Sequence, residues 1–277
     1  MIVAAVSPAV GADELHGYIL HEVGTNPDQQ LRRVVMGDPW PSTEPVATLQ
    51  RAVSGTAVSP DGELLALDGA TDELVRIDVA TGDVETLVAL DIDIAPWWIF
   101  EADLAIDTNG GAWIVNRGIL YELDLATGVT SVVGDTGSDI GILVSHDGEL
   151  YAAGLSNFLR ISPDTAHAVV IATYSGTEWD CFFSGLTSIG RALQGLYQCW
   201  NVGAPNEPRI VTVDTADGHV DPIGVLFDLD PWQPNYAFEV IAVPTDDTAI
   251  PELSLAGRIG FALMLALAAA VLLRRAR

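Results

Sequence analysis

The sequence contains no lysine, so its positive charge comes from 12 arginines, which face 38 aspartates and glutamates. The formal net charge of −26 repels phosphate backbones and anionic lipid, and we therefore expect no nucleic-acid partner. The simplest use of so much negative charge is a solvated surface that resists aggregation. Clustered carboxylates are also ligands that calcium prefers, which keeps calcium open as a cofactor.

Short catalytic signatures are missing as well. The chain has no G-x-S-x-G turn, no phosphate-binding loop, no H-E-x-x-H and no C-x-x-C. Its five histidines stand in unrelated contexts: His16, His21, His146, His167 and His219. The sequence therefore predicts no catalytic residue, and the spacing of the histidines indicates no metal site.

Four copies of a two-part pattern fill the middle of the chain. Each copy reads as strand, glycine turn, strand, and then strand, polar turn, strand. Apolar and polar residues alternate within each run, which is the period of a half-buried strand. The copies cover residues 56–89, 104–134, 142–173 and 186–224.

The length of this repeat predicts the fold. The glycines of the first turns, Gly62, Gly110, Gly148 and Gly190, follow one another at 48, 38 and 42 residues. Four strands in roughly 40–45 residues are typical of a β-propeller blade. Asp-Gly and Asn-Gly at three of these turns favour tight hairpins with two residues at positive φ. We expect an all-β propeller of five or six blades over residues 13–243, closed by a strand over 237–243.

One aspartate recurs in the second half of the repeat, as Asp78, Asp124 and Asp214. A recurring place in a blade favours a structural role, so we expect these residues to cap turns. The segment 74–82, Leu-Val-Arg-Ile-Asp-Val-Ala-Thr-Gly, and the phrase Ser-Pro-Asp-Gly over 59–62 resemble bacterial propellers of the NHL and YVTN kind. The resemblance spans residues 50–225 and implies a propeller without a particular activity, because such folds host binders and enzymes alike.

Both ends of the sequence indicate export. Small residues at Val10-Gly11-Ala12 fit a signal-peptidase site, which makes residues 1–12 the remnant of a signal peptide; the alternative is an edge strand. Residues 255–273 form a long apolar run, and Arg274, Arg275 and Arg277 follow it. A run of this length suits a membrane helix over 255–277 with a cytoplasmic arginine cluster, although a buried core helix is the alternative.

A short signature precedes the apolar run, after a polar stretch that begins at residue 244. It consists of Ile250, Pro251, Glu252, Leu253 and Ser254. A proline-containing signature, an apolar helix and an arginine cluster, in that order, resemble PEP-CTERM and IPTL-CTERM sorting tails. The resemblance implies an exosortase-type membrane protease as a partner and passage to the cell surface; Glu252 departs from the IPTL type, which has threonine there. A tail anchor that is never cut is the alternative, and either reading anchors the protein in the inner membrane before any processing.

Only two cysteines occur, Cys181 and Cys199. An even number of cysteines in an exported domain predicts a disulfide, because the periplasm and the cell surface are oxidising. The intervening residues contain a turn signal at 188–190, and a hairpin there would bring the two cysteines to opposed or nearby strand positions. Two buried free thiols are the alternative.

Two pairs of alternating carboxylates precede tryptophan-containing segments. They are Asp91 with Asp93 and Asp228 with Asp230. Such a pair beside tryptophan could form a sugar-binding shelf or a calcium-organised loop, and packing between blades is the alternative.

The sequence therefore favours a non-enzymatic surface or envelope protein that binds a glycan or a protein through its propeller loops. The alternative is an extracytoplasmic hydrolase or lyase with a metal at the mouth of the central channel.

Overall fold

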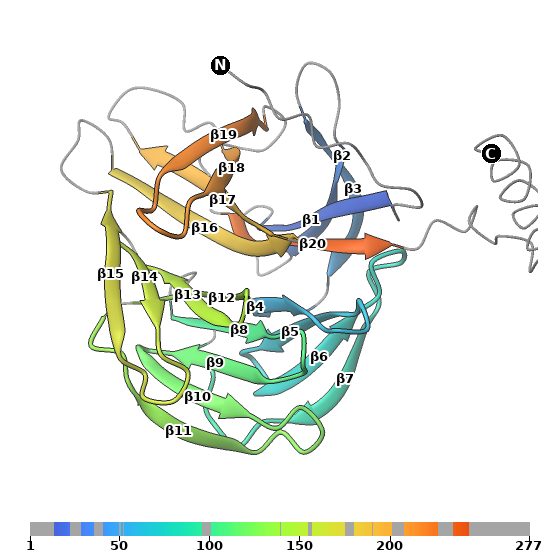
Figure 1. Cartoon of the computed structure of the whole chain (residues 1–277). Coiled ribbons are helices and arrows are strands. Elements are labelled where there is room, and N and C mark those ends of the chain that lie inside the picture. Colours follow the sequence, from blue (N-terminus) through green and yellow to red (C-terminus); the bar gives the residue numbers. More distant parts are fainter. Residues whose placement is uncertain are drawn as a thin grey trace, which may run out of the picture. The chain divides into compact units, whose positions relative to one another are not determined.

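Every regular element in the described part of the chain is a β-strand. The computed structural model describes residues 14–22, 29–35, 41–49, 51, 53–95, 101–138, 140–154, 157–174, 180–189, 191–200, 208–226 and 235–243. Their twenty strands form five four-stranded sheets around a common axis (Figure 1). The predicted all-β propeller is confirmed, and it has five blades.

Four blades are built from consecutive strands and coincide with the four sequence repeats. Blade 2 contains β4 (Val53–Val58), β5 (Leu64–Asp68), β6 (Glu73–Ile77) and β7 (Val84–Ala89). Blade 3 contains β8 (Ala102–Ile106), β9 (Ala112–Asn116), β10 (Ile119–Leu123) and β11 (Thr130–Asp135). Blade 4 contains β12 (Ile142–His146), β13 (Glu149–Ala153), β14 (Asn157–Ile161) and β15 (Ala168–Thr173). Blade 5 contains β16 (Asp180–Ile189), β17 (Ala192–Trp200), β18 (Arg209–Val213) and β19 (Val220–Val225).

Blade 1 joins the two ends of the propeller. It contains β1 (Glu14–Glu22), β2 (Gln29–Val35), β3 (Ser42–Leu49) and β20 (Asn235–Val243), in the order β20-β1-β2-β3. The last strand thus completes a sheet that the first strands of the chain begin. This confirms the closing strand predicted over 237–243, which completes a fifth blade beside the four repeats.

Several predictions for the termini lie outside the described residues. These are the signal-peptide remnant over 1–12, the linker and sorting signature over 244–254 and the membrane helix over 255–277. In the part of the chain that the structure describes, no helix is long and apolar enough to span a membrane.

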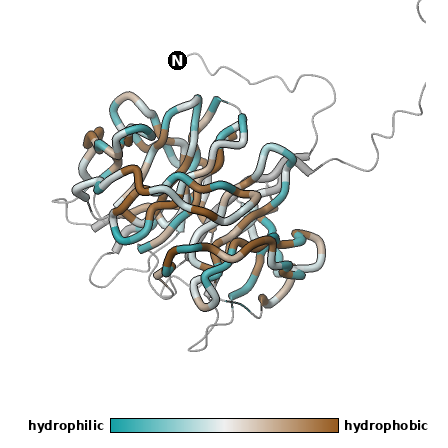
Figure 2. Tube along the Cα trace, turned by 90° about the horizontal axis from the view of Figure 1, so that it is seen from below, coloured by the Kyte–Doolittle hydropathy of each residue, from teal (hydrophilic) through white to brown (hydrophobic). Residues whose placement is uncertain are grey.

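The hydrophobic core consists of layers between successive blades. One layer joins Leu67 and Leu74 of blade 2 to Leu104 and Ile114 of blade 3. Further layers join blade 3 to blade 4, blade 4 to blade 5 and blade 5 to blade 1. Strands that lie between two such layers, such as β5, are covered on both faces, and all five residues of β5 are buried. Figure 2 shows apolar segments running through the interior.

The recurring aspartates make the turn between the third and fourth strands of a blade. Asp78 Oδ1 accepts hydrogen bonds from the N–H groups of Ala80 (2.8 Å) and Thr81 (3.1 Å). Asp124 does the same for Ala126 and Thr127, and Asp214 does so for Ala216. The N–H of Ala126, with help from Thr127, lowers the pKa of Asp124. The structural role predicted for these aspartates is confirmed.

The prediction of tight glycine hairpins holds at only one of its three sites. Asp147 (φ 51°) and Gly148 (φ 81°) form a two-residue turn between β12 and β13. In blades 2 and 3 the first and second strands are joined by five-residue loops, and only Gly62 and Gly110 have positive φ. Hydrogen bonds inside these loops close them, such as those from Gly62 N–H to Ser59 O and from Gly110 N–H to Asp107 O.

Every outermost strand contains a β-bulge at the same place. One aliphatic residue is skipped in the pairing of each outer strand with its neighbour: Val46 in β3, Leu87 in β7, Val133 in β11, Ile171 in β15 and Ile223 in β19. A propeller has as many exposed edges as blades, and each edge could pair with another chain. A bulge twists the edge and interrupts its ladder, so the five bulges oppose edge-to-edge aggregation.

Candidate functional site: the axial cavity

A cavity of about 370 Å³ opens where the inner strands of four blades end. Its walls come from the ends of β4, β8, β12 and β16 and from the turns that follow the first three. The polar lining residues are Ser59, Asp107, Thr108, Ser145, Asp147, Thr187 and Ser188. The lining includes no arginine, so this site presents hydroxyl and carboxylate oxygens above an aliphatic wall.

Turn length shapes this cavity. The five-residue loops of blades 2 and 3 contribute Ser59, Pro60 and Thr108, whereas the two-residue turn of blade 4 contributes Asp147 and Gly148. The Asp107 side chain braces its own loop by accepting hydrogen bonds from the N–H groups of Asn109 and Gly111, both at 2.8 Å. The walls are thus held by local hydrogen bonds before any ligand arrives.

Asp103 ties together the inner strands that carry the cavity. Its Oδ1 accepts from the N–H groups of Thr56 in β4 (3.1 Å) and Leu104 in β8 (2.8 Å). Its Oδ2 accepts from the N–H of Leu143 in β12 (2.8 Å). Burial raises the pKa of Asp103 to about 8, although the three N–H donors act in the opposite direction.

Close approach of β4 to β8 requires glycine opposite this carboxylate. A Cβ atom on Gly55 would lie 2.5 Å from Asp103 Cα and 2.6 Å from its Oδ1. Both distances are shorter than van der Waals contact, so any side chain at position 55 would push the two strands apart. Gly55 and Asp103 therefore act as one unit that joins blades 2, 3 and 4.

A histidine and a serine meet behind the cavity wall. The Nδ1 atom of His146 lies 2.8 Å from Ser188 Oγ, and Ser188 lines the cavity. The His146 side chain is buried, 5% exposed, and its Nε2 lies 3.9 Å from Asp147 Oδ2. Of the three histidines whose side chains the structure describes, His146 alone adjoins this cavity, and His167 and His219 are exposed. The side chains of His16 and His21 are outside the described part.

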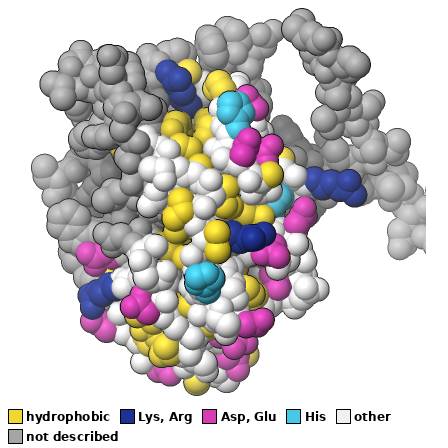
Figure 3. Space-filling view, turned by 60° about the vertical axis from the view of Figure 1, so that its left-hand side comes forward, with side chains coloured by type: hydrophobic (Ala, Val, Ile, Leu, Met, Phe, Trp, Pro, Cys, Tyr) yellow, Lys and Arg dark blue, Asp and Glu magenta, His cyan; other side chains and the backbone are white. Residues whose placement is uncertain are grey.

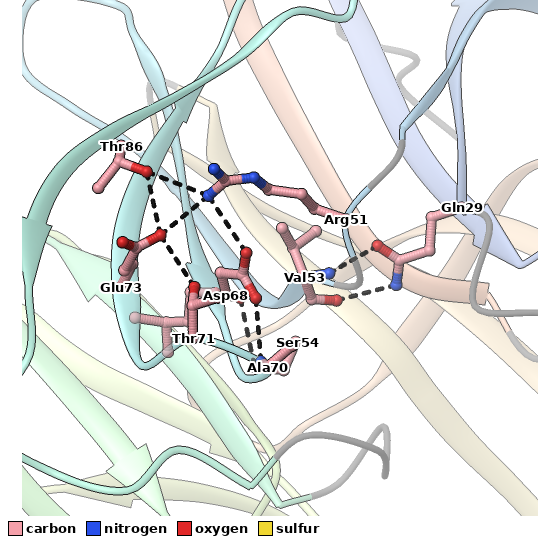
Figure 4. A network of polar contacts seen from close by, with 10 residues as sticks. Gln29, Arg51, Val53, Ser54, Asp68, Ala70, Thr71, Glu73 and Thr86 are labelled. Atoms are coloured by element: carbon pink, nitrogen blue, oxygen red, sulfur yellow. Dashed lines mark hydrogen bonds and ion pairs between the residues drawn. The ribbon is translucent and has the colours of Figure 1, made fainter.

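A second polar network lies at the other end of β4. The Gln29 side chain pairs with the backbone of Val53 through two hydrogen bonds, of 2.8 and 2.9 Å, and so joins blade 1 to blade 2 (Figure 4). Beside it, Arg51 Nη1 contacts the buried Asp68 at 3.3 Å and Glu73 at 3.0 Å. Hydrogen bonds from Thr71 and Thr86 lower the pKa of Glu73. All these groups are paired with one another, so we assign the network to the interface between blades.

The predicted carboxylate pair Asp91 and Asp93 does not share a partner. Asp91 Oδ1 accepts from the N–H (2.9 Å) and the hydroxyl (2.8 Å) of Thr130 and thereby joins blade 2 to blade 3. Asp93 lies 3.6 Å from Arg117 with its side chain largely exposed. Asp228 and Asp230 are outside the described residues. Within the described ranges, no three His, Cys, Asp or Glu side chains are grouped as metal ligands.

The outer strands carry exposed aliphatic side chains between the acidic ones. The most exposed are Val129, Val132, Val169 and Val170, on or beside β11 and β15. Figure 3 shows hydrophobic and acidic side chains mixed on the face that these strands help to form. Because the exposed aliphatic residues described on these strands are mixed with acidic ones on this face, the axial cavity is the better defined site.

Short sequence motifs could not reveal the contacts that hold the cavity wall together, because the partners are far apart in the sequence. His146 and Ser188 are 42 residues apart, and Asp103 is 47 residues from Thr56 and 40 from Leu143. Each separation is close to one repeat, because equivalent positions of neighbouring blades lie side by side. Aligning the polar residues of the inner strands by repeat is the signal that would have grouped them.

Comparison with known proteins agrees with this architecture. No protein-family model and no curated protein matches the chain. Solved structures do, and one of them is a chain in the crystal structure of a nidogen/laminin complex. It aligns with a TM-score of 0.55 at 12% identity, over 84% of this chain and 100% of its own length. At this identity the similarity shows the fold alone. The protein is thus a five-bladed β-propeller with a cavity at one end of its axis.

Proposed function

We propose that this protein is a binding propeller of the bacterial envelope that engages a protein or glycan ligand at its axial cavity. The observation that carries the proposal is the cavity itself, which four blades build from inner-strand ends and braced turns. Ligand sites are concave and largely preformed, with a few placed polar groups on an apolar wall. A structurally similar chain comes from a protein–protein complex, which supports a protein ligand.

Export and anchoring are part of the same proposal. They are supported by the apolar run over 255–273, the arginines behind it and the signature over 250–254. A reporter that is active only in the periplasm should give signal when fused after Val243 and none when fused after Arg277. Equal signal at both junctions would contradict anchoring, and an intact mass that includes residues through Arg277 would contradict cleavage by a sorting protease.

Site-specific photo-crosslinking tests the binding site. A benzophenone amino acid at Thr108, on the cavity rim, should capture a discrete partner in the native envelope. The same group at Val132, which is 69% exposed on outer strand β11, should not capture that partner. Identical capture from both positions, or none from Thr108, would contradict binding at the cavity.

A further inference from the structure

The contact between Ser188 and His146 has the elements of an activated nucleophile. A serine hydroxyl is a weak nucleophile until a neighbouring base accepts its proton. Here the hydroxyl oxygen lies 2.8 Å from the imidazole Nδ1, and Ser188 faces the cavity while His146 is buried behind it. We propose that Ser188 is a catalytic nucleophile, with His146 as its general base, and that the axial cavity cleaves an ester.

The base is held in place by aromatic packing. The His146 ring lies against Tyr151, with 6.2 Å between ring centroids. Tyr151 in turn stacks on Phe158 at 5.6 Å, and Phe158 contacts Phe183 at 6.2 Å. This row of rings fixes the imidazole before any ligand binds, and catalytic groups need such preorganisation.

The turn after β12 supplies the remaining groups. The Asp147 carboxylate lies 3.9 Å from His146 Nε2, beyond hydrogen-bond distance, and its side chain is 69% exposed. Its negative charge favours the imidazolium that forms when the serine proton moves. Asp147 and Gly148 both line the cavity. Ser188 lines the same cavity, so this turn is the part of the wall that we assign to stabilising a developing oxyanion.

The reaction balances without a metal or a redox partner. Ser188 Oγ bonds to the ester carbonyl carbon as its proton passes to His146 Nδ1. The ester C–O bond then breaks, and the departing alkoxide takes that proton and leaves as an alcohol. Water then gives a proton to His146 Nδ1 while its oxygen bonds to the acyl carbonyl carbon. The bond between that carbon and Ser188 Oγ breaks, Oγ takes the proton back from His146, and the carboxylic acid leaves.

The cavity also limits the substrate class. About 370 Å³ holds a small group, and Asp107 and Asp147 repel anions from a lining that contains no arginine. We expect short-chain esters, such as acetyl esters, with a neutral or cationic remainder. This inference uses the cavity of the proposed binding function but requires no protein partner, so the two proposals can fail separately.

A fluorophosphonate probe, which reacts with activated serines, provides the test on the full-length protein in detergent. The probe should label Ser188, as located by peptide mass spectrometry, and Ser188→Ala should abolish labelling. His146→Gln retains a hydrogen-bonding side chain but cannot take the proton, and should slow labelling about 100-fold or more. Ser184→Ala is the matched control, because it removes a fully buried hydroxyl from the same strand and should label like the unaltered protein.

Hydrolysis of p-nitrophenyl acetate gives a second readout that needs no variant. Turnover should stop when Ser188 has been labelled. Circular dichroism and the thermal midpoint verify that each variant is folded, and a poorly folded His146→Gln would be replaced by His146→Asn. The proposal is overturned if the folded protein is not labelled at Ser188, if the histidine variants label at the same rate, or if labelling leaves turnover intact.

Discussion

The Asp103 carboxylate shows how one side chain can hold three blades. Its two oxygens accept from N–H groups of β4, β8 and β12, so any replacement leaves at least one of these donors without an acceptor. An unsatisfied buried donor costs about 1–3 kcal/mol. Asp103→Asn places an amide N–H₂ where one oxygen stood, and we expect it to lower the free energy of unfolding by that amount in urea titrations at about pH 4.5.

Proton linkage at Asp103 adds a pH dependence with a defined sign. Burial raises its pKa from 3.8 to about 8, so between these values the folded state holds a proton that the unfolded state has released. Stability from this group is full below the lower value and is lost as pH rises toward the upper one. The unfolding free energy of the unaltered protein minus that of Asp103→Asn should therefore fall between about pH 4.5 and 8. A difference that stays constant over this range would mean that the N–H donors keep the carboxylate ionised.

Small residues at the interfaces between blades form matched pairs. A Cβ atom on Gly82 of blade 2 would lie 2.2 Å from Ala47 Cβ of blade 1, and one on Gly218 of blade 5 would lie 2.4 Å from Ala172 Cβ of blade 4. Between blades 3 and 4 the two residue types exchange places, with alanine in the turn and glycine on the outer strand. Ala166 takes the left-handed turn position, with φ 58°, and Gly134 faces it from β11.

This reversal predicts an energetic coupling. Gly134→Ala would place a Cβ 3.2 Å from Ala166 Cβ and 3.3 Å from Thr165 O, and should destabilise the protein. Ala166→Gly removes that contact and the strain of alanine at positive φ. We expect the double variant to be more stable than the sum of the single changes by about 1 kcal/mol, measured by chemical denaturation. Additive effects would show that the two positions adjust independently.

At the scale of strands and turns, local sequence predicted most of the fold. Alternating apolar residues located the strands of blades 2 to 5, and the side chain of Asp78 was correctly assigned to a turn. The bulges were missed because the skipped residues, such as Leu87 and Ile171, are aliphatic and look like ordinary strand residues. Asp103 and the His146–Ser188 pair were missed because their partners belong to neighbouring blades. The loop lengths around Gly62 and Gly110 depend on hydrogen bonds inside each loop, which the dipeptide alone does not specify.

The hairpin of β16 and β17 provides the element-scale prediction. Cys181 and Cys199 are direct partners in its backbone register, as the spacing had indicated. The third strand, β18, pairs with β17 over residues 193–197, so among the residues that the structure describes the cysteines lie in a two-stranded extension. Two-stranded ribbons are marginal by themselves, and a cross-link closing a loop of this size would stabilise the protein by roughly 3 kcal/mol.

We therefore predict a disulfide between Cys181 and Cys199 in protein taken from the native envelope. Thiol titration under denaturing, non-reducing conditions should find no reactive thiol. Replacing both cysteines by serine should lower stability only when the reference protein is oxidised, and the two proteins should unfold alike after reduction. Two reactive thiols in the native protein would exclude the bridge.

At the scale of the whole molecule, the large negative net charge affects stability. A net charge of −26 with no lysine makes the compact state repel itself, and dissolved salt screens that repulsion. The screening length falls from about 30 Å at 0.01 M to about 8 Å at 0.15 M ionic strength. We expect the thermal midpoint to rise over this range, equally in sodium and potassium chloride, because screening does not depend on the identity of the cation.

Calcium chloride at matched ionic strength separates screening from specific binding. Screening alone would give a midpoint close to that in sodium chloride. A cation site would add a rise that saturates with calcium and is removed by a chelator, following the linkage of binding to stability. Since Asp91 and Asp93 have separate partners, and no grouped ligands occur in the described ranges, we expect only the screening effect from this part of the chain. If a saturable rise is found, Asp228→Asn with Asp230→Asn tests whether the second carboxylate pair is its source, and Asp91→Asn with Asp93→Asn is the matched control.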